Sequence, residues 1–378
     1  HWEYLPLALA PSEEYDDYQK GGCFSGSAIE HEGKLYVFYT ATANHGNGNV
    51  QTQCLAISED GIHFEKYTRN PLITVPEGIE PDSFRDPKVW KHENKYYMVV
   101  GASRNNRGLA LIYESADLYH WNFLNVLAES RGEWGFMWEC PDFYQLGDKY
   151  VLTFSPMGSG DHTSVYLTGD FDYKTGKFDW HISGEMDWGF DFYAPQTFET
   201  PVGRRILIGW AGVPDAEYSS NPMNEGWQHS LTVPRELRYH NGKIYQLPIR
   251  ELGQLRKKEI LPEKESYVLD NGCGELIFAG IAGSSSAAIC VQIGTGCSLS
   301  YEKGLVTLQF TDDSGAGRGK RVARCEAVHK IQILMDVSIL EIYINDGEIV
   351  MTSRIFFSGK DATVRFLGQA EMIQAWQL

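Results

Sequence analysis

Four copies of one strand-like segment recur along the chain, and this repeat constrains the fold more than any other feature. Each copy is a basic residue followed by aromatic and β-branched residues, and the copies begin near Lys34, Lys95, Lys149 and Arg205. They are spaced by 61, 54 and 56 residues, slightly more than the roughly 40 to 50 residues of common propeller blades. The repeat therefore predicts an all-β chain whose first part is a β-propeller.

A short polar or acidic segment precedes each copy by about one strand length. In a ring of blades the equivalent innermost strands line one central channel, so these segments should converge on one end of it. Asp86 and Glu139 are predicted to occupy the same register of the repeat and to meet in one site. The four segments are Phe-Ser-Gly-Ser at 24–27, Phe-Arg-Asp-Pro at 84–87, Trp-Glu-Cys-Pro at 138–141 and Asp-Phe-Tyr-Ala-Pro-Gln at 191–196.

A second repeated sequence pattern suggests that the chain begins inside a repeat. Residues 58–64 and 115–121 share the pattern Ser-x-Asp-x-x-His-aromatic, and His1-Trp2 resembles the end of a further copy. We therefore expect the first blade to be incomplete at the N-terminus. An incomplete ring exposes strand edges, which a second copy of the chain could cover, so a homo-oligomer is a hypothesis.

The second half of the chain has a different pattern. Asn241-Gly242 is a strong two-residue hairpin signal, and the charged stretch 251–265 contains Pro262, which stops a helix. From residue 267 onward, short alternating strands with turns such as 345–347 favour a β-sandwich. The predicted domains are a propeller at 1–250, a linker at 251–265 and a sandwich at 266–378.

Composition narrows the classes of ligand. The net charge of −17 and the isoelectric point near 5.1 argue against nucleic acid and anionic membranes, which would repel such a chain. Neutral small molecules fit better. The sequence has no apolar run of eighteen residues that could span a membrane.

The cysteines and histidines indicate neither a disulfide framework nor a metal site. Seven cysteines are scattered singly, which favours reduced thiols in a cytoplasmic protein. The dipeptides His31-Glu32 and His92-Glu93 lack the second histidine of a zinc motif. We expect no metal and no cofactor.

Two segments invite a phosphate-binding interpretation. The glycine-rich stretch 314–321 has Ser314 where a Walker loop needs glycine and Arg321 where it needs Ser or Thr, so an exposed hairpin tip is predicted instead. Residues 104–107 are predicted to form another hairpin tip. There Arg107 is either a solvated turn residue or a contact for a substrate phosphate.

Glycoside hydrolysis needs at least two carboxylates that face one cavity. Locally, Asp86 could merely begin a turn before Pro87, and Glu139 could be an acid at a packed strand end. Arg85 is expected to keep Asp86 ionised. An aromatic collar would favour the protonated form of Glu139 by desolvation; its members are Trp134, Phe136 and Trp138.

At this point the motifs resemble those of glycoside hydrolase family 32, the invertase and β-fructosidase family. The match runs in order along the chain. It covers residues 24–27, 85–87, 139–141, 191–196, 226–237 and, near the end, 350–354.

The resemblance implies a five-bladed propeller followed by a β-sandwich, and retaining hydrolysis of β-fructofuranosides through a covalent fructosyl-enzyme intermediate. It implies that Glu139 is the general acid/base and that Asp86 stabilises the transition state. Sucrose, sucrose 6-phosphate and short fructans are the implied substrates. The fructose subsite would be lined by Phe24, Ser25, Arg85, Tyr193 and Trp210.

The nucleophile of that family lies in an Asn-Asp-Pro-Asn-Gly segment, which these 378 residues do not contain. We therefore expect weak or no turnover from this polypeptide. Asp82, Asp142 and Asp161 could substitute poorly, but they are predicted to be ordinary loop acids. Two alternatives stay open: a non-catalytic fructoside-binding propeller, and an inverting five-bladed hydrolase of the arabinan or xylan type, whose carboxyl groups would lie farther apart.

Overall fold

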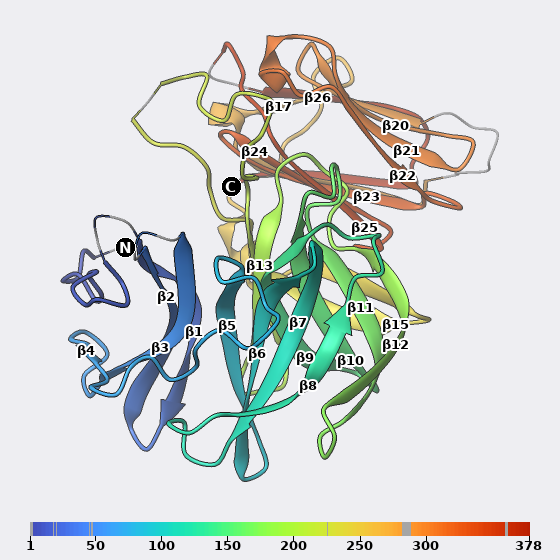
Figure 1. Ribbon diagram of the computed structural model, residues 1–378. Coiled ribbons are helices and arrows are strands. Elements are labelled where there is room, and N and C mark those ends of the chain that lie inside the picture. The colour runs from blue at the N-terminus through green and yellow to red at the C-terminus, as the bar shows by residue number, and fades with distance from the viewer. Residues whose placement is uncertain are drawn as a thin grey trace. The chain divides into compact units, whose positions relative to one another are not determined.

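The computed structural model describes residues 3–17, 19, 21–44, 46, 48–224, 226–281, 289–359 and 362–378. These residues form an all-β structure of six antiparallel sheets (Figure 1). The chain divides into two compact units, residues 1–183 and 184–378, and each is described by itself. The predicted repeat at His1-Trp2 lies outside the described residues. The 3-10 helices are η1 (Arg250–Leu255), η2 (Asp270–Gly272) and η3 (Asp313–Gly315).

The first unit contains three sheets of four strands, each built from consecutive strands. The sheets are β1 (Gly22–His31), β2 (Lys34–Asn44), β3 (Asn49–Ser58) and β4 (Glu65–Lys66); β5 (Phe84–His92), β6 (Lys95–Arg104), β7 (Arg107–Ser115) and β8 (Asn122–Glu129); and β9 (Met137–Leu146), β10 (Lys149–Met157), β11 (Val165–Asp172) and β12 (Lys177–Glu185).

The repeated segment forms the second strand of each sheet, as the sequence predicts. Strands β2, β6 and β10 begin at Lys34, Lys95 and Lys149, and each is largely buried because its side chains pack against the neighbouring sheet. The polar segments lie in the first strands. Strand β5 contacts both β1 and β9, so the first strands of the three sheets lie side by side, as neighbouring blades require.

The second repeated phrase forms one turn twice. The Oδ1 atoms of Asp60 and Asp117 each accept hydrogen bonds from the backbone amides two and three residues ahead. The ring nitrogens of His63 and His120 lie 2.7 Å from the other oxygen of the same carboxylates. Asp is suited to such turns because its short side chain can bond to the following backbone. The sequence echo therefore marks the connection from the third to the fourth strand.

The second unit begins with a sheet of four strands, β13 (Tyr193–Glu199), β14 (Arg205–Trp210), β15 (Arg235–His240) and β16 (Lys243–Pro248). The predicted hairpin is confirmed. Asn241 and Gly242 join β15 to β16 with φ angles of 50° and 78°, the positive values that a type I′ turn needs.

Two further sheets pack face to face, as in the predicted sandwich. One core includes Leu276, Ile333 and Ile342 of the five-stranded sheet and Val291 and Leu308 of the six-stranded sheet, all fully buried. The six-stranded order is β17 (Ser266–Leu269), β26 (Ala362–Leu367), β19 (Ile289–Ile293), β20 (Cys297–Glu302), β21 (Leu305–Phe310), β22 (Lys320–Arg324); the five-stranded order is β25 (Ile349–Arg354), β24 (Ile339–Ile344), β23 (Lys330–Asp336), β18 (Gly274–Ala279), β27 (Met372–Gln377).

The charged segment 251–265 is attached to the five-stranded sheet along part of its length. The Lys257 amide donates to the Gln377 carbonyl at 2.9 Å and the Ile260 amide to the Ala375 carbonyl at 2.8 Å. The Arg256 side chain pairs with Glu275 at 2.6 Å. Cationic residues at one end of the segment therefore dock on the sheet, and the predicted boundaries at 250 and 265 stay a prediction.

The glycine-rich stretch 314–321 connects β21 to β22, but the prediction of an exposed tip is wrong for Arg318. This side chain is buried, and its Nε and Nη2 each lie 2.7 Å from an oxygen of the Asp191 carboxylate. A buried carboxylate requires a cation or several donors, and Asp191 draws Arg318 inward for this reason.

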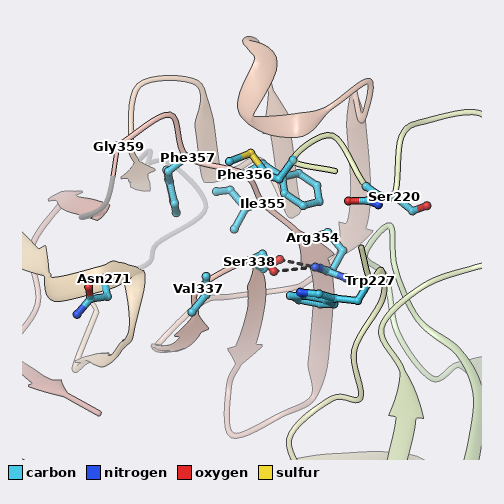
Figure 2. Close-up of a pocket in the computed structure, with 12 residues that line it drawn as sticks. Ser220, Trp227, Asn271, Val337, Ser338, Arg354, Ile355, Phe356, Phe357 and Gly359 are labelled. Atoms are coloured by element: carbon cyan, nitrogen blue, oxygen red, sulfur yellow. Dashed lines mark hydrogen bonds between the residues drawn. The ribbon is translucent and has the colours of Figure 1, made fainter. Parts of the chain in front are cut away.

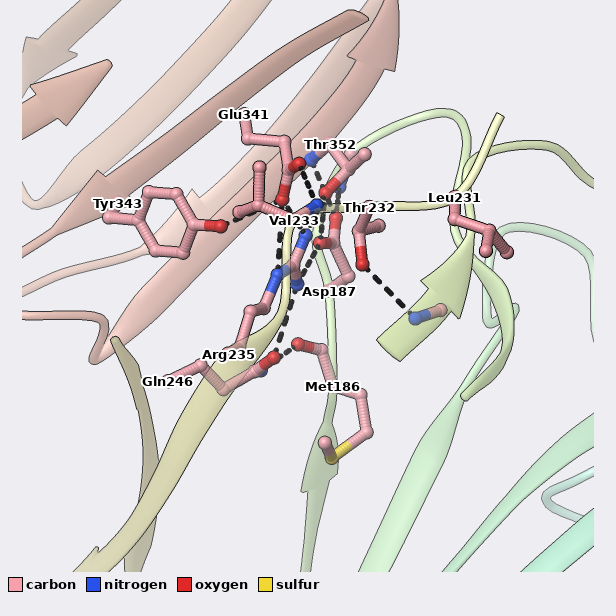
Figure 3. A network of polar contacts seen from close by, with 12 residues as sticks. Met186, Asp187, Leu231, Thr232, Val233, Arg235, Gln246, Glu341, Tyr343 and Thr352 are labelled. Atoms are coloured by element: carbon pink, nitrogen blue, oxygen red, sulfur yellow. Dashed lines mark hydrogen bonds and ion pairs between the residues drawn. The ribbon is translucent and has the colours of Figure 1, made fainter. Parts of the chain in front are cut away.

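A second buried ionic network joins the β13–β16 sheet to the five-stranded sheet within the second unit (Figure 3). Arg235 has no exposed surface, and its Nη2 lies 2.6 Å from Glu341 Oε2 and its Nη1 3.1 Å from Asp187 Oδ2. Tyr343 donates to Glu341 at 2.7 Å, and Thr352 donates to Asp187 at 2.6 Å. One guanidinium therefore neutralises part of the charge of two buried carboxylates.

We predict that Arg235→Met lowers the free energy of unfolding by about 3 to 5 kcal/mol, because it leaves Asp187 and Glu341 buried without their cation. The control is Arg238→Met on the same strand, where the side chain is 63% exposed; it should cost less than about 1 kcal/mol. Urea unfolding curves of both variants test the prediction. A loss below 1 kcal/mol in Arg235→Met contradicts it.

Candidate active site

An ion pair between two first strands marks the candidate site in the first unit. Arg85 of β5 donates from Nε at 2.9 Å and from Nη2 at 2.8 Å to Glu139 Oε1 of β9. The side chains are only 11% and 19% exposed, so the pair lies in a partly desolvated environment. The structure therefore brings Glu139 to the strand that carries Asp86.

The strand pairing corrects the predicted register. Arg85 lies opposite Gly101, the seventh residue of β6, and Glu139 lies opposite Ser155, the seventh residue of β10. Glu139 is thus equivalent to Arg85, and Cys140 is equivalent to Asp86. The predicted equivalence of the two acids is wrong by one residue.

A backbone irregularity allows the two acids to meet in spite of this offset. Asp86 and Cys140 each precede a proline, have positive φ angles of 66° and 48°, and lie at a break in the strand ladder. Such a bulge redirects side chains from strict alternation. Asp86 Oδ2 accepts a hydrogen bond from the Cys140 amide at 2.8 Å, which anchors the Asp86 carboxylate beside Glu139 on β9.

Buried polar side chains on the neighbouring sheet hold this segment, and the sequence analysis missed them. Thr40 Oγ1 of β2 accepts from the Asp86 amide at 2.9 Å. Gln51 Oε1 of β3 accepts from the Phe84 amide at 2.9 Å and from Arg85 Nη1 at 3.2 Å. Both side chains are buried, as are Thr42, Thr52 and Gln53 on the same two strands, and polar residues grouped within buried strands are the signal that could have revealed them.

Burial dominates the electrostatics of Asp86. It raises the pKa of this carboxyl to about 6, although the hydrogen bond from the Cys140 amide and the Arg85 guanidinium lower it in part. Arg85 does favour the ionised form of Asp86, as predicted, but burial outweighs it, and the Nε and Nη2 donors of Arg85 go to Glu139. Burial also raises the pKa of the Cys140 thiol, which makes this residue a poor nucleophile.

The predicted aromatic collar around Glu139 belongs largely to the core. Trp138 is fully buried, its ring stacks on Phe154 with centroids 3.9 Å apart, and its Nε1 donates to the Trp134 carbonyl at 2.8 Å. The structure places the cation of Arg85 against Glu139.

Close approach of two sheets depends on one glycine. A Cβ atom added at Gly101 would lie 1.9 Å from the Trp138 carbonyl oxygen, a distance that no side chain tolerates. Only glycine allows β6 to approach the backbone that carries Glu139 at this point.

The remaining predicted sugar-site residues fall in both units. Phe24, 44% exposed, and Ser25 lie at the bulge of β1, the strand beside β5. Tyr193 and Trp210 lie opposite each other on β13 and β14 of the second unit, with ring centroids 6.2 Å apart.

The acids considered as substitute nucleophiles have different surroundings. Asp82 and Asp161 are exposed loop residues, as predicted. Asp142 is not a loop acid: it is buried within β9, and its Oδ2 lies 3.5 Å from Lys88 Nζ. A strand position of this kind gives Asp142 a structural partner.

The described part of the chain also contains no metal-binding cluster, disulfide or membrane-spanning helix. No group of three His, Cys, Asp or Glu side chains within it could hold a metal ion. All seven cysteines are among the described residues, and none forms a disulfide. None of the helices in these parts of the chain has the length and apolar character needed to cross a membrane.

The raised pKa of Asp86 makes stability depend on pH. Between 3.8 and about 6 the native state binds more protons at this group than the unfolded state, so stability falls as pH rises through that window. We predict that Asp86→Asn removes this dependence. The stability of the wild-type chain relative to the variant should fall by roughly 2 to 3 kcal/mol between pH 3.5 and 7.

Denaturant unfolding across this pH range tests the prediction, with Asp117→Asn as a control of opposite sign. Its turn hydrogen bonds lower the pKa of Asp117 to about 2. The wild-type chain should therefore gain stability relative to that variant as pH rises from 2 to 4. A pH-independent difference for Asp86→Asn would refute the assignment.

Two protein-family models match most of the chain. Residues 1–248 match the model described as the glycosyl hydrolases family 32 N-terminal domain, and residues 300–376 match the family's C-terminal model.

Curated relatives match along nearly the whole length. A sucrose-6-phosphate hydrolase of Bacillus subtilis is 36% identical over 407 aligned positions, covering 100% of this chain and 83% of the relative. A sucrose-6-phosphate hydrolase of Salmonella typhimurium is 38% identical, covering 94% of this chain and 77% of the relative.

Solved structures give the same result. A β-fructofuranosidase of Bombyx mori superposes with a TM-score of 0.86 at 32% identity, covering 100% of this chain and 82% of that one. A mutant of the same enzyme in complex with sucrose also superposes with a TM-score of 0.86.

Proposed function

The chain belongs to glycosyl hydrolases family 32, and from this premise we propose that it acts on the β-fructofuranosidic bond of sucrose or sucrose 6-phosphate, with short fructans as further substrates. One observation carries the proposal: Arg85 bonds to Glu139 while the adjacent Asp86 bonds to the backbone beside Glu139. Two carboxyl groups from different sheets thus share one site, as glycoside hydrolysis requires.

We assign Glu139 as the general acid/base. Both hydrogen bonds from Arg85 to Glu139 go to Oε1, which fixes the orientation of the carboxyl group, and we assign proton exchange with the glycosidic oxygen to Oε2. Asp86 is assigned as the stabiliser of the transition state. Its Oδ2 is held by the Cys140 amide, and its Oδ1 is assigned to the fructosyl hydroxyls.

We assign Phe24, Ser25, Arg85, Tyr193 and Trp210 to the sugar subsite, and we assign the reaction to the retaining type. Phe24 and Ser25 lie at the bulge of β1, equivalent to the bulge that places Asp86. Trp210 and Tyr193 complete the subsite in this proposal, and Arg85 contributes through its fixed guanidinium.

We further propose that the chain folds as a five-bladed propeller followed by a β-sandwich, with domain boundaries at 250 and 265. The four sheets of consecutive strands, β1–β4, β5–β8, β9–β12 and β13–β16, are assigned as four of the blades. None of the seven cysteines forms a disulfide, which supports a reducing, cytoplasmic location.

Turnover by this 378-residue polypeptide is proposed to be weak. The sequence has no Asn-Asp-Pro-Asn-Gly segment, and a retaining mechanism requires a carboxylate nucleophile. General acid catalysis alone supplies roughly 10²- to 10⁴-fold. Binding of the fructosyl group does not need the nucleophile and is expected to persist.

The test measures reducing-sugar release and binding heat with sucrose and sucrose 6-phosphate. We predict that Glu139→Gln lowers any release by roughly 10²- to 10⁴-fold and changes affinity by less than about threefold. Glu114→Gln, which removes a surface pair with Lys95, is the control and should change neither quantity.

Release of reducing sugar that is unchanged in Glu139→Gln would contradict the assignment of Glu139 as the general acid/base. Binding heat without release in the wild-type chain favours the alternative of a fructoside-binding propeller. Inversion of the anomeric centre in the product would instead favour an inverting hydrolase.

A separate prediction concerns the phosphate of sucrose 6-phosphate. Arg107 begins β7 at an exposed hairpin tip, where Asn105 and Asn106 have φ angles of 53° and 59°. We expect Arg107→Ala to leave the ratio of affinities for sucrose and sucrose 6-phosphate within twofold, because the side chain is solvated. A larger drop for the phosphorylated sugar alone would make Arg107 a phosphate contact.

A further inference from the structure

A cavity of about 360 Å³ lies within the second unit, and none of its lining residues is assigned to catalysis (Figure 2). Its size is in the range of small-molecule sites. Loop residues between β14 and β15 form one wall, and the segments around β24 and β25 form the other. The lining combines apolar rings with few polar groups; its principal members are Met223, Trp227, Ser338, Arg354, Phe356 and Phe357.

Arg354 is the polar centre of this cavity. Its side chain is buried, with 2% exposure. Nε donates to the Ser338 carbonyl at 2.8 Å, and Nη2 lies 2.6 Å from Ser338 Oγ. Within the described residues Nη1 has no hydrogen-bond partner. A buried donor without a partner is costly, and more so on a charged group.

The charges around Arg354 do not balance. Asp191 is the acid that faces it, and Arg318 already binds both oxygens of Asp191 at 2.7 Å. Arg354 reaches Asp191 only through its backbone amide, at 2.8 Å. None of the described lining residues is acidic. Two guanidinium groups therefore share one carboxylate, and the cavity keeps an excess positive charge.

Aromatic rings flank the guanidinium of Arg354. It lies 5.8 Å from the ring centroid of Trp227 and 5.5 Å from that of Phe356. Trp227 is 54% exposed and Met223 is 55% exposed, so solvent reaches the loop wall of the cavity. An exposed flat ring beside a buried cation is suited to a ligand with a ring-shaped body and an anionic group.

We propose that this cavity binds a hexose phosphate, with the phosphate on Arg354 and the sugar ring against Trp227. The sugar part of this inference rests on the proposed function, since the relatives are named for a phosphorylated disaccharide. The anionic part rests on the unpaired Nη1 and the charge excess.

Isothermal titration of the full chain with glucose 6-phosphate tests the inference. Glucose 6-phosphate should bind at least tenfold more tightly than glucose and than inorganic phosphate. Arg354→Gln and Trp227→Ala should each weaken its binding by about tenfold or more, since the first removes a charged donor. Trp227→Ala keeps the test valid if Arg354→Gln does not fold. The control is Arg250→Gln, where the side chain is 77% exposed; it should bind like the wild-type chain.

Absence of glucose 6-phosphate binding, or equal binding by wild type and folded variants, overturns the proposal. Inorganic phosphate that binds as tightly as glucose 6-phosphate overturns the assignment to a sugar. These outcomes are independent of sugar release and of Glu139. If the chain binds glucose 6-phosphate but never cleaves sucrose, and Trp227→Ala abolishes this binding, then the cavity proposal is supported while the proposed function fails.

Discussion

A positive φ angle at the residue before proline organises the candidate site. Asp86, Cys140 and Ala194 adopt it at equivalent places, with values of 66°, 48° and 48°. A residue before proline normally has extended backbone, and a non-glycine residue in the left-handed region costs of order 1 to 3 kcal/mol. Such a conformation persists only where surrounding contacts fix it. At Asp86 these contacts are the bonds to Thr40 and to the Cys140 amide, so the polar layer and the bulge depend on each other.

The second unit uses buried charge in a different way. Arg235 and Arg318 each meet carboxylates that have almost no exposed surface. Breaking a buried ion pair is strongly destabilising, because the remaining charge has no water to solvate it. The motif segments 191–196 and 226–237 contain Asp191 and Arg235, so part of what resembles a catalytic signature is structural. Arg354 differs from both other arginines, since one of its donors has no partner among the described residues.

Local signals in the sequence predicted much of the fold. Strands β2, β6 and β10 begin at the repeated lysines, and the Asn241-Gly242 turn joins β15 to β16, because alternation and turn chemistry act over a few residues. The site was predicted in outline: Glu139 does meet the Asp86 strand. The one-residue offset can be read from the sequence, since Asp86 directly precedes Pro87 whereas Cys140 separates Glu139 from Pro141. The side-chain directions at the bulge could not be predicted. The support from Thr40 and Gln51 also comes from a sheet distant in sequence.

The sequence by itself determined the all-β class, the strand periodicity, the hairpins and the family, because each depends on short-range pattern or on motifs in order along the chain. Only the tertiary structure decided which groups became partners. Burial raises the pKa of Asp86 to about 6, although the charge of Arg85 lowers it in part. Arg318 is buried where it binds Asp191, which lies 127 residues away in the chain. Desolvation and ion pairing depend on distances between remote segments, and those distances exist only once the sheets have packed.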